Sequence, residues 1–320
     1  MERRDFIALA GSAAVAGWPW LACAQDGKRI PRVGVLIAGN PDAILRIFRD
    51  SLRKLGHVEG TTIRLEVRHA DGDSEILAPL ARELAGLKVD LLVAIQTPAA
   101  QAAKQATTQI PVVILAGDPV GTGLIASLAR PGGNITGISS STAELGGKLL
   151  QLVRELLPGA KRIAVLANAA DPFTKSFLGQ LQSPARAIKV ELLTYMMRNA
   201  GEYAGAFAAM GKGRAEVVIV QPSLARKAAA ELAQKYRLPS VSPSGLFTEE
   251  GGLMSYSANI EEVYAGLAVY ATKVLNGAKP ADLPVQQPTK FDFRLNVKIA
   301  RALGIEIPQS LLARADQVIE

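Results

Sequence analysis

Cysteine, tryptophan and histidine are scarce in this chain of 320 residues, and their positions exclude several classes of function. The one cysteine and both tryptophans lie within the first 24 residues, at Cys23, Trp18 and Trp20. Beyond residue 24 the chain therefore has no disulfide and no thiol nucleophile, and its fold must rest on burial of apolar side chains. The two histidines, His57 and His69, have no neighbour at metal-ligand spacing, and no G-x-S-x-G elbow of a serine hydrolase occurs.

Residues 1–24 have the features of an export signal. Arg3 and Arg4 form a twin-arginine pair ahead of an apolar stretch, 6–21, that glycine and proline interrupt. This stretch is too short and too broken to span the roughly 30 Å core of a bilayer. The following Ala-Cys-Ala has the small-x-small pattern of a cleavage site. We therefore expect a twin-arginine signal peptide, cleavage after about Ala24 and a periplasmic location.

Two other interpretations of this segment stay open. It could form an N-terminal core helix, although helix-breaking residues ahead of an Ala-x-Ala site favour export. Lipid attachment at Cys23 would instead anchor the chain to the membrane, but Trp20 stands where a lipobox normally has leucine.

Positive charge is in excess, with 36 lysines and arginines against 29 acidic residues and a net charge of +7. The basic residues are spread along predicted helical faces, with acidic residues between them, as at Arg46, Arg49, Arg53 and Lys54. No basic run is interleaved with aromatic residues, as a surface that binds nucleic acid would have. We therefore expect no nucleic-acid partner.

From residue 33 onward, short apolar runs alternate with longer amphipathic segments. The apolar runs predict strands at 33–38, 62–69, 89–95 and 111–116. Helices are predicted at 42–57, 74–87 and about 98–106, with a short helix after Gly121. Strands separated by helices of this size are typical of βαβ units and a parallel sheet.

The same alternation restarts at Ser141. Ser141 and Glu144 have the spacing of a capping box, ahead of a helix that ends at Pro158-Gly159. Further strands are predicted at 162–167, 189–195, 216–221 and 240–242. A long helix at about 261–276 and a final strand and helix within 291–308 complete the pattern.

This pattern predicts an α/β fold of two doubly wound parallel-sheet lobes. Lobe 1 comprises residues 25–140 with a return segment 256–285, and lobe 2 comprises 141–255 with a C-terminal segment 286–320. The chain then passes between the lobes three times, and these three crossing segments act as the hinge.

Polar residues follow the predicted strands, at the edge where open parallel sheets bind their ligands. Hydroxyl, amide and carboxylate groups beside prolines can together hold a small polar molecule between two lobes. The candidate ligand-binding residues are Asn40, Thr97, Pro98, Asp118, Asn168, Gln221, Ser244, Tyr256 and Asn259.

Several of these positions, and two further carboxylates at the strand ends, Asp42 and Asp171, have a purely structural alternative. Asn40, Asp42 and Asp171 could be helix N-caps, and Thr97-Pro98 could be a cap followed by a first-turn proline. Asp118-Pro119 could be only a turn. A carboxylate at a strand end above a cleft is nevertheless well placed to face a ligand ammonium group, and Asp118 is our candidate for that role.

The glycines after the fourth predicted strand raise the question of a nucleotide site. Residues 121–126, GTGLIA, match the G-x-G-x-x-A form of the dinucleotide fingerprint. That fingerprint follows its strand directly, whereas Asp118, Pro119 and Val120 intervene here. Asp118 also puts negative charge where a pyrophosphate would lie. We therefore expect no nucleotide and no other cofactor.

Several longer stretches resemble one protein family. They include LRKLGHVEGTTIRLEVRHADGD, KVDLLVAIQTPAAQAAKQATTQIPVV, GDPVGTGLIASLARPGGNITGIS, LVRELLPGAKRIAVLANAADP and GAKPADLPVQQPTKFDFRLNVKIARALGI. The chain from about Val33 to Glu320 is similar to the substrate-binding proteins of ABC transporters whose better-known members take up tryptophan or tyrosine. The resemblance implies a type I periplasmic-binding-protein fold, hinge closure on a ligand and delivery to a membrane permease with its ATPase subunits. Our hypothesis is therefore a monomeric receptor, and because ATP hydrolysis would belong to a partner subunit, we expect no cofactor.

The resemblance also implies which residues line the cleft, and one of them departs from the family pattern. Matching position by position places Asn40, Thr97, Asp118, Asn168, Gln221, Ser244 and Tyr256 in the cleft. Family members that hold an amino acid often have Tyr-Gly-x-Asp where this chain has Tyr256-Ser-Ala-Asn259. The amide of Asn259 removes an anion that could pair with a ligand ammonium group, an interaction of about 1.5–3 kcal/mol.

The sequence thus predicts a periplasmic substrate-binding protein of an ABC importer that closes around a small organic solute, such as an amino acid. Two alternatives belong to other classes. One is an exported sensor that presents its closed form to a signalling partner, and the other is an exported enzyme on the same two lobes. The sequence leaves the identity of the solute open.

Overall fold

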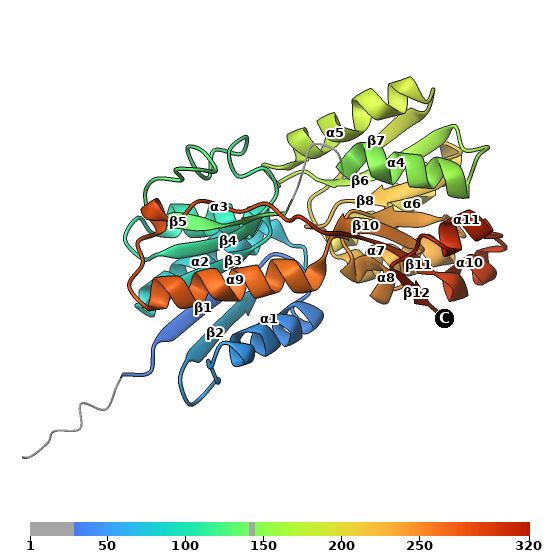
Figure 1. Ribbon diagram of the computed structural model, residues 1–320. Coiled ribbons are helices and arrows are strands. Elements are labelled where there is room, and N and C mark those ends of the chain that lie inside the picture. Colours follow the sequence, from blue (N-terminus) through green and yellow to red (C-terminus); the bar gives the residue numbers. More distant parts are fainter. Residues whose placement is uncertain (1–28, 141–144) are drawn as a thin grey trace, which may run out of the picture.

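The computed structural model describes residues 29–140 and 145–320. The predicted signal peptide and the predicted capping box at Ser141 and Glu144 therefore lie outside the described residues. In the described part of the chain the strands form two sheets, each with helices on both faces. Figure 1 shows them as two lobes side by side, which confirms the predicted fold class.

The first lobe is built on a five-stranded sheet of order β2-β1-β3-β4-β5, in which every pair is parallel. Its strands are β1 (Arg32–Ile37), β2 (Arg64–His69), β3 (Leu91–Ile95), β4 (Val112–Ala116) and β5 (Ile135–Ser139). Its helices are α1 (Asp42–Lys54), α2 (Leu77–Gly86), α3 (Thr97–Ala106) and α9 (Ile260–Leu275).

Side chains that alternate along each strand give this sheet two apolar faces. Val33 and Val35 of β1 pack with α1 and α9 on one face, whereas Leu36 packs with α2 and α3 on the other. Figure 1 shows α9, in orange, lying along the first lobe near α1. Helix α9 thus completes the core of a lobe whose strands all precede residue 140.

The second lobe is built on a seven-stranded sheet of order β12-β11-β10-β9-β8-β6-β7. Only the β10–β11 pair is antiparallel among the strand pairs that the structure describes. The strands are β6 (Arg162–Asn168), β7 (Glu191–Met197), β8 (Val217–Val220), β9 (Ser240–Ser242), β10 (Met254–Ala258), β11 (Phe291–Asn296) and β12 (Gln317–Ile319). The helices are α4 (Leu145–Leu156), α5 (Thr174–Ala187), α6 (Tyr203–Lys212), α7 (Arg226–Lys235), α8 (Leu246–Glu249), α10 (Val297–Leu303) and α11 (Gln309–Leu312).

The chain passes between the two sheets after β5, after β10 and before β11. The first passage includes residues outside the described part. The second lies at Asn259, between β10 and α9, and the third follows Gln286, which still bridges to Ile138 of β5. Because β10 pairs with β9 and β11, residues 256–258 belong to the second sheet, and the return to the first lobe begins three residues later than the sequence suggested.

The structure corrects the sequence-based prediction in two further places. The short helix predicted after Gly121 is replaced by turns, because Asp118 and Gly123 have positive φ angles of 43° and 71° that interrupt a helix. Strands β5, β10 and β12 were not predicted. Strand β12 has only three residues, and the sequences of β5 and β10, ITGIS and MSYSA, mix serine, threonine and glycine with apolar residues, so neither forms the continuous apolar run of a buried strand.

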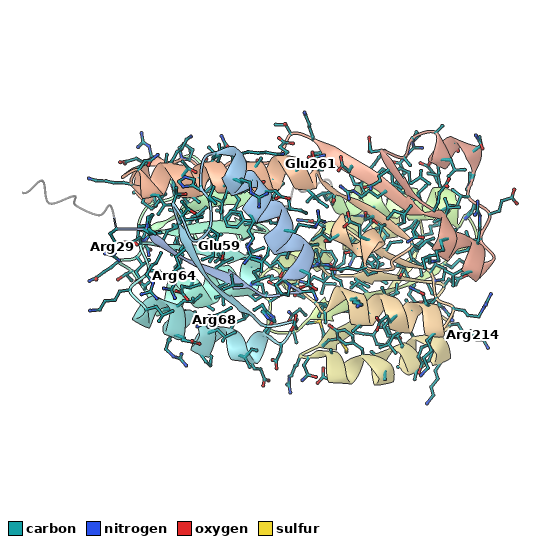
Figure 2. The ribbon with its side chains drawn as sticks, turned by 90° about the horizontal axis from the view of Figure 1, so that it is seen from below. Arg29, Glu59, Arg64, Arg68, Arg214 and Glu261 are labelled. Carbon is teal, nitrogen blue, oxygen red and sulfur yellow. The ribbon has the colours of Figure 1, made fainter. Side chains whose placement is uncertain are left out.

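Charged side chains cover the outside of both lobes. Figure 2 shows Arg29, Arg64 and Arg68 on the first lobe and Arg214 at the far end of the second. Arg64 also pairs with Glu66, with 2.8 Å between Nε and Oε1. The labelled arginines therefore do not gather in one stripe. Across the described ranges, no helix combines the length and the apolar character needed to cross a membrane.

Candidate functional site

The cleft between the lobes contains three cavities that meet at Ser140 and Pro222. The first, of about 40 Å³, is also lined by Gly117, Phe173 and four polar residues, and we name it the polar chamber after these four, although the surface exposed in it is mostly apolar: Gln96, Thr97, Asp171 and Ser223. The aromatic chamber, also of about 40 Å³, is lined by Leu145, Gly146, Leu149, Phe173, Phe177, Gln180 and Pro243. The hinge-side chamber, of about 110 Å³, lies between α1, α9 and the strand ends of both lobes. One water needs roughly 10–15 Å³ on this scale, so a small organic molecule would extend through more than one chamber.

The first lobe contributes the ends of β3 and β4 to the polar chamber. Thr97 begins α3 directly after β3, and its Oγ1 accepts a hydrogen bond from the backbone N–H of Gly117 at 3.0 Å. This bond ties the end of β3 to the end of β4. The N-terminus of α3 then faces the cleft, where the helix dipole favours a negatively charged ligand group.

The second lobe contributes a buried carboxylate. Asp171 follows β6 and is only 5% exposed. Its Oδ1 accepts a hydrogen bond from the N–H of Phe173 at 2.9 Å, and its Oδ2 accepts one from Gln221 Nε2 at 2.8 Å and one from Ser223 Oγ at 2.6 Å. These three donors hold the carboxylate at the wall of the polar chamber.

Among the residues that the structure describes, no positive charge accompanies this carboxylate. None of the lysines, arginines or histidines in the described ranges forms an ion pair with Asp171. Burial therefore raises the pKa of Asp171 from 3.8 to about 6, although the three hydrogen bonds oppose that rise. At neutral pH the cleft thus contains a buried anion that a cationic ligand group would stabilise.

Two buried residues with amide side chains, Gln221 and Asn168, fix the position of the Asp171 carboxylate. The side chain of Gln221 is fully buried, and its Oε1 accepts hydrogen bonds from the N–H of Asn168 at 2.9 Å and from Thr174 Oγ1 at 3.0 Å. These bonds orient Gln221 so that its Nε2 points to Asp171. Asn168 and Gln221 therefore position the carboxylate and do not line the three chambers themselves.

The aromatic chamber lies on the other side of Phe173. Phe173 and Phe177 are one helical turn apart at the start of α5, and their ring centroids are 6.1 Å apart with the rings tilted by 45°. Leu145 and Leu149 of α4 and Pro243, which follows β9, complete an apolar wall. A flat apolar group fits the chemistry of this chamber.

The hinge-side chamber combines apolar walls with one buried arginine. Arg226 at the start of α7 has a side chain that is 2% exposed. Its Nε and Nη2 donate to both carboxylate oxygens of Glu250 at 2.9 and 2.8 Å, and its Nη1 donates to the carbonyl of Pro222 at 2.9 Å. Because this guanidinium is already paired in two directions, it fixes the cleft wall and is a weak candidate for binding an anionic ligand.

The lobes are in direct contact across the cleft. Gln96 Nε2 donates to the carbonyl of Pro222 at 2.6 Å, and Asn168 Nδ2 donates to Ser74 Oγ at 3.1 Å. Ser176 Oγ donates to Asp118 Oδ2 at 2.6 Å. Each bond joins one residue of the first lobe to one of the second, so the structure is in a closed form.

Two glycines permit this close approach. A Cβ atom on Gly117 would lie 2.9 Å from three ring atoms of Phe173, and one on Gly72 would lie 2.5 Å from the backbone nitrogen of Ala225. Gly72 also has a φ of +87°, which side-chain-bearing residues rarely adopt. Side chains at either position would therefore hold the lobes apart.

The structure places two of the predicted ligand-binding residues on chamber walls. Thr97 lines the polar chamber and Ser244 lines the hinge-side chamber. Pro98 occupies the first turn of α3, where it sets the helix start. Asn40 accepts a hydrogen bond from the N–H of Asp42 at 3.0 Å, but it precedes Pro41, the N-cap residue of α1, so it is not the N-cap that the sequence left as an alternative.

Asp118, Tyr256 and Asn259 have other contacts than those predicted. The carboxylate of Asp118 accepts from Ser176, as above, and Tyr256 stacks on Phe291 with ring centroids 6.0 Å apart. Asn259 caps α9, because its Oδ1 accepts from the N–H of Glu262 at 2.8 Å, and its Nδ2 donates to Asp292 at 3.0 Å. It lines a separate outer groove beside α1 and α9, so its amide does not replace an anion in the three chambers.

The sequence analysis missed most of the chamber walls. Phe173 and Phe177 have the i, i+4 spacing of a buried helical stripe, which is the pattern of an ordinary core. Pro222 and Pro243 each follow a strand, and their position there was the one available signal.

Over the described ranges, no group of three or more histidine, cysteine, aspartate and glutamate residues could hold a metal ion.

Comparisons with known proteins agree on one family. The family model described as ABC transporter substrate binding protein matches residues 33–319. A tyrosine-binding protein of Clostridioides difficile is 27% identical over 289 residues, which cover 88% of this chain and 83% of that protein. The solved structure of an ABC domain in complex with L-Trp from Streptococcus pneumonia is 28% identical and superposes with a TM-score of 0.81 over 90% of this chain and 99% of that one.

A third comparison concerns whether the two lobes of this structure are open or closed. The ligand-free, open structure of a substrate-binding protein with adhesive properties from Clostridium difficile is 27% identical, and its TM-score is 0.60 over 91% of this chain and 99% of that one. The two solved structures have nearly equal identity to this chain, so sequence distance does not explain the difference between 0.81 and 0.60. The structure is closer to the complex than to the open form, in agreement with the hydrogen bonds across its cleft.

Proposed function

The chain belongs to the family of ABC transporter substrate-binding proteins, and we propose that it captures an amino acid with an aromatic side chain for an ABC importer. The observation that carries this proposal is the juxtaposition of Asp171, a buried carboxylate that pairs with none of the described cations, with the helix α3 N-terminus and with an aromatic chamber. A zwitterion with a flat apolar side chain complements all three features.

The two charges of the ligand have separate partners in this proposal. The ammonium group pairs with Asp171, and the carboxylate lies toward Thr97 at the N-terminus of α3. Asp171 thus takes the role that the sequence analysis gave to Asp118. The aromatic side chain extends past Phe173 against Phe177, where stacking and burial favour it. The tyrosine-binding relative and the L-Trp complex support an aromatic ligand.

The mechanism is binding followed by closure, with no chemical step. Ligand groups that contact both lobes stabilise the closed form over the open one, and the three crossing segments bend as the hinge. The closed monomer delivers its ligand in the periplasm to a membrane permease, whose ATPase subunits hydrolyse ATP. This protein itself is not an enzyme and needs no cofactor in this proposal.

A ligand screen tests the proposed function directly. We expect L-tryptophan, L-tyrosine or L-phenylalanine to raise the unfolding temperature of the chain from residue 25 onward. A ligand at about 100 times its Kd adds roughly 2.7 kcal/mol to the free energy of unfolding. Because this chain has no tryptophan, the fluorescence of bound L-tryptophan confirms binding without background. No shift with any aromatic amino acid, and a shift with a solute that lacks an ammonium group, would overturn the proposal.

Binding of L-tryptophan is expected to weaken as the pH falls below about 6. The empty cleft takes up a proton near the pKa of Asp171, which is about 6, and the protonated carboxyl no longer attracts an ammonium group. The Kd should then rise by up to about tenfold per pH unit, until the pH reaches the lower pKa of the ligand-bound form. Isothermal titration between about pH 5 and pH 8 measures this, and a constant Kd would contradict the pairing.

The stability of the empty protein should respond to pH in the opposite direction. The folded pKa of Asp171 lies above its unfolded value of 3.8, so the ionised group destabilises the fold fully above about pH 6 and not at all below about pH 4. The contribution of Asp171 to the free energy of unfolding therefore rises on acidification, whereas the affinity for the ligand falls. The variant Asp171→Asn serves as the control, because it should remove both dependences.

A further inference from the structure

We infer that Asp118 and Ser176 form a latch between the lobes that determines how long the closed form persists. The pair joins the loop after β4 in the first lobe to the first turn of α5 in the second, with 2.6 Å between Ser176 Oγ and Asp118 Oδ2. This inference deepens the proposed function, because it concerns release of the same ligand. Neither residue lines any of the three chambers, so the latch does not depend on contact with the ligand.

The loop around Asp118 holds its carboxylate ready for this contact. Asp118 has a φ of +43°, a conformation that non-glycine residues rarely adopt without a local reason. The N–H of Gly121 donates to Asp118 Oδ1 at 2.9 Å, and Thr122 Oγ1 donates to the carbonyl of Asp118 at 2.8 Å. Lys104 of α3 anchors the same loop through a hydrogen bond to the carbonyl of Gly123. One carboxylate oxygen is thus bound within the loop and the other points across the cleft.

This arrangement accounts for the glycine-containing segment 118–123, DPVGTG, which the proposed function leaves without a role. Its glycines shape a compact turn that presents one aspartate, and a nucleotide phosphate would be repelled by that aspartate. The segment therefore stabilises the closed form and does not bind a ligand.

In the second lobe, the carboxylate of Asp118 lies in an environment that favours a negative charge. Ser176 is the third residue of α5, so Asp118 lies near the positive end of that helix dipole. A hydroxyl donor and a helix N-terminus both favour an anion there. Beside the latch, Gly117 packs against the ring of Phe173, which brings the backbones of the two lobes close enough for the hydrogen bond to form.

The latch makes a kinetic prediction. Breaking an interaction that exists only in the closed form speeds opening and leaves the encounter with ligand nearly unchanged. We expect Ser176→Ala to raise the rate of L-tryptophan release on the order of tenfold, with an association rate close to that of the unmodified chain. Ser176→Thr keeps the hydroxyl and should restore slow release. Ser183→Ala, at an exposed serine of the same helix, is the matched control.

Stopped-flow fluorescence of bound L-tryptophan measures both rates. A change in the association rate alone, or equal release from Ser176→Ala and Ser183→Ala, would overturn the latch. In an Asp118→Gly background, which lacks the carboxylate, Ser176→Ala should not raise the release rate further, because the hydrogen bond that it removes is already absent.

A measurement without ligand separates the latch from the proposed function. The chain from residue 25 has no cysteine, so Glu75→Cys and Lys212→Cys, exposed positions on different lobes, accept a pair of spin labels without interference. In the ligand-free chain, Ser176→Ala should shift the label distances toward an open population, and Ser176→Thr should not. If L-tryptophan fails to bind but this shift occurs, the ligand proposal fails and the latch stands. Unchanged distances would overturn the latch, whatever the chain binds.

Discussion

Asp171→Asn is expected to weaken L-tryptophan binding about 10- to 150-fold. The asparagine has nearly the same shape but no charge, so it loses a charge-assisted hydrogen bond to the ligand ammonium group, which is worth about 1.5–3 kcal/mol. The effect should be large because Asp171 is 5% exposed and no described cation competes for it. Isothermal titration at about pH 7.5, well above the pKa of about 6, measures the difference with the carboxylate fully ionised.

A ligand without the ammonium group provides the control for Asp171. Indole-3-propionate has the ring and carboxylate of L-tryptophan but no amine, so the same substitution should not weaken its binding. An equal loss for both molecules would mean that the substitution damages the cleft. Gln221 and Ser223 both donate to the carboxylate, so loss of these hydrogen bonds would damage the cleft. Thermal unfolding of the ligand-free variant distinguishes the two outcomes, since a damaged cleft also lowers the unfolding temperature.

Gly117→Ala is expected to weaken ligand binding about 5- to 150-fold through closure alone. The added methyl group would lie 2.9 Å from three atoms of the Phe173 ring, but only when the lobes are closed. Overpacking of this kind typically destabilises a well-packed contact by about 1–3 kcal/mol. Because the open form does not contain this contact, the penalty falls on the closed, ligand-bound form.

The same variant should separate binding from stability. The unfolding temperature of ligand-free Gly117→Ala should change little where the open form is populated, while small-angle scattering should show less compaction on addition of L-tryptophan. Gly205→Ala in α6 is the matched control, because a Cβ there meets no atom within 4 Å. If both variants bind L-tryptophan as tightly as the unmodified chain, then Gly117 does not limit closure.

Periodicity in the sequence was sufficient to predict the two-lobe α/β fold. Runs such as LLVAI in β3 are buried on both sides of a parallel sheet, so they are continuously apolar and easy to recognise. Strand β10 could not be recognised in this way. Its MSYSA sequence is stable as a strand because β9 and β11 flank it, and those pairings are tertiary information.

The site was predictable only in its location. The ends of parallel strands meet at one edge of a sheet, so Thr97, Asp118 and Asp171 were all expected near the cleft. Their roles differ because of contacts that no local pattern encodes. Asp118 has a donor in the other lobe, whereas Asp171 has only neutral donors from its own lobe and a chamber in front of it. Asp171 also binds the N–H of Phe173, as a local cap would, so its sequence context indicated a cap.

The position of α9 also sets an order of events during synthesis. The helix covers one apolar face of the first sheet, yet roughly 120 residues of second-lobe sequence separate it from the end of β5. At a translation rate of about 5–20 residues per second, roughly 6–25 s pass between the synthesis of β5 and that of α9, and during this time the face lacks α9. The first lobe therefore cannot finish folding before most of the second has been made, and the nascent chain must protect an exposed apolar surface throughout that interval.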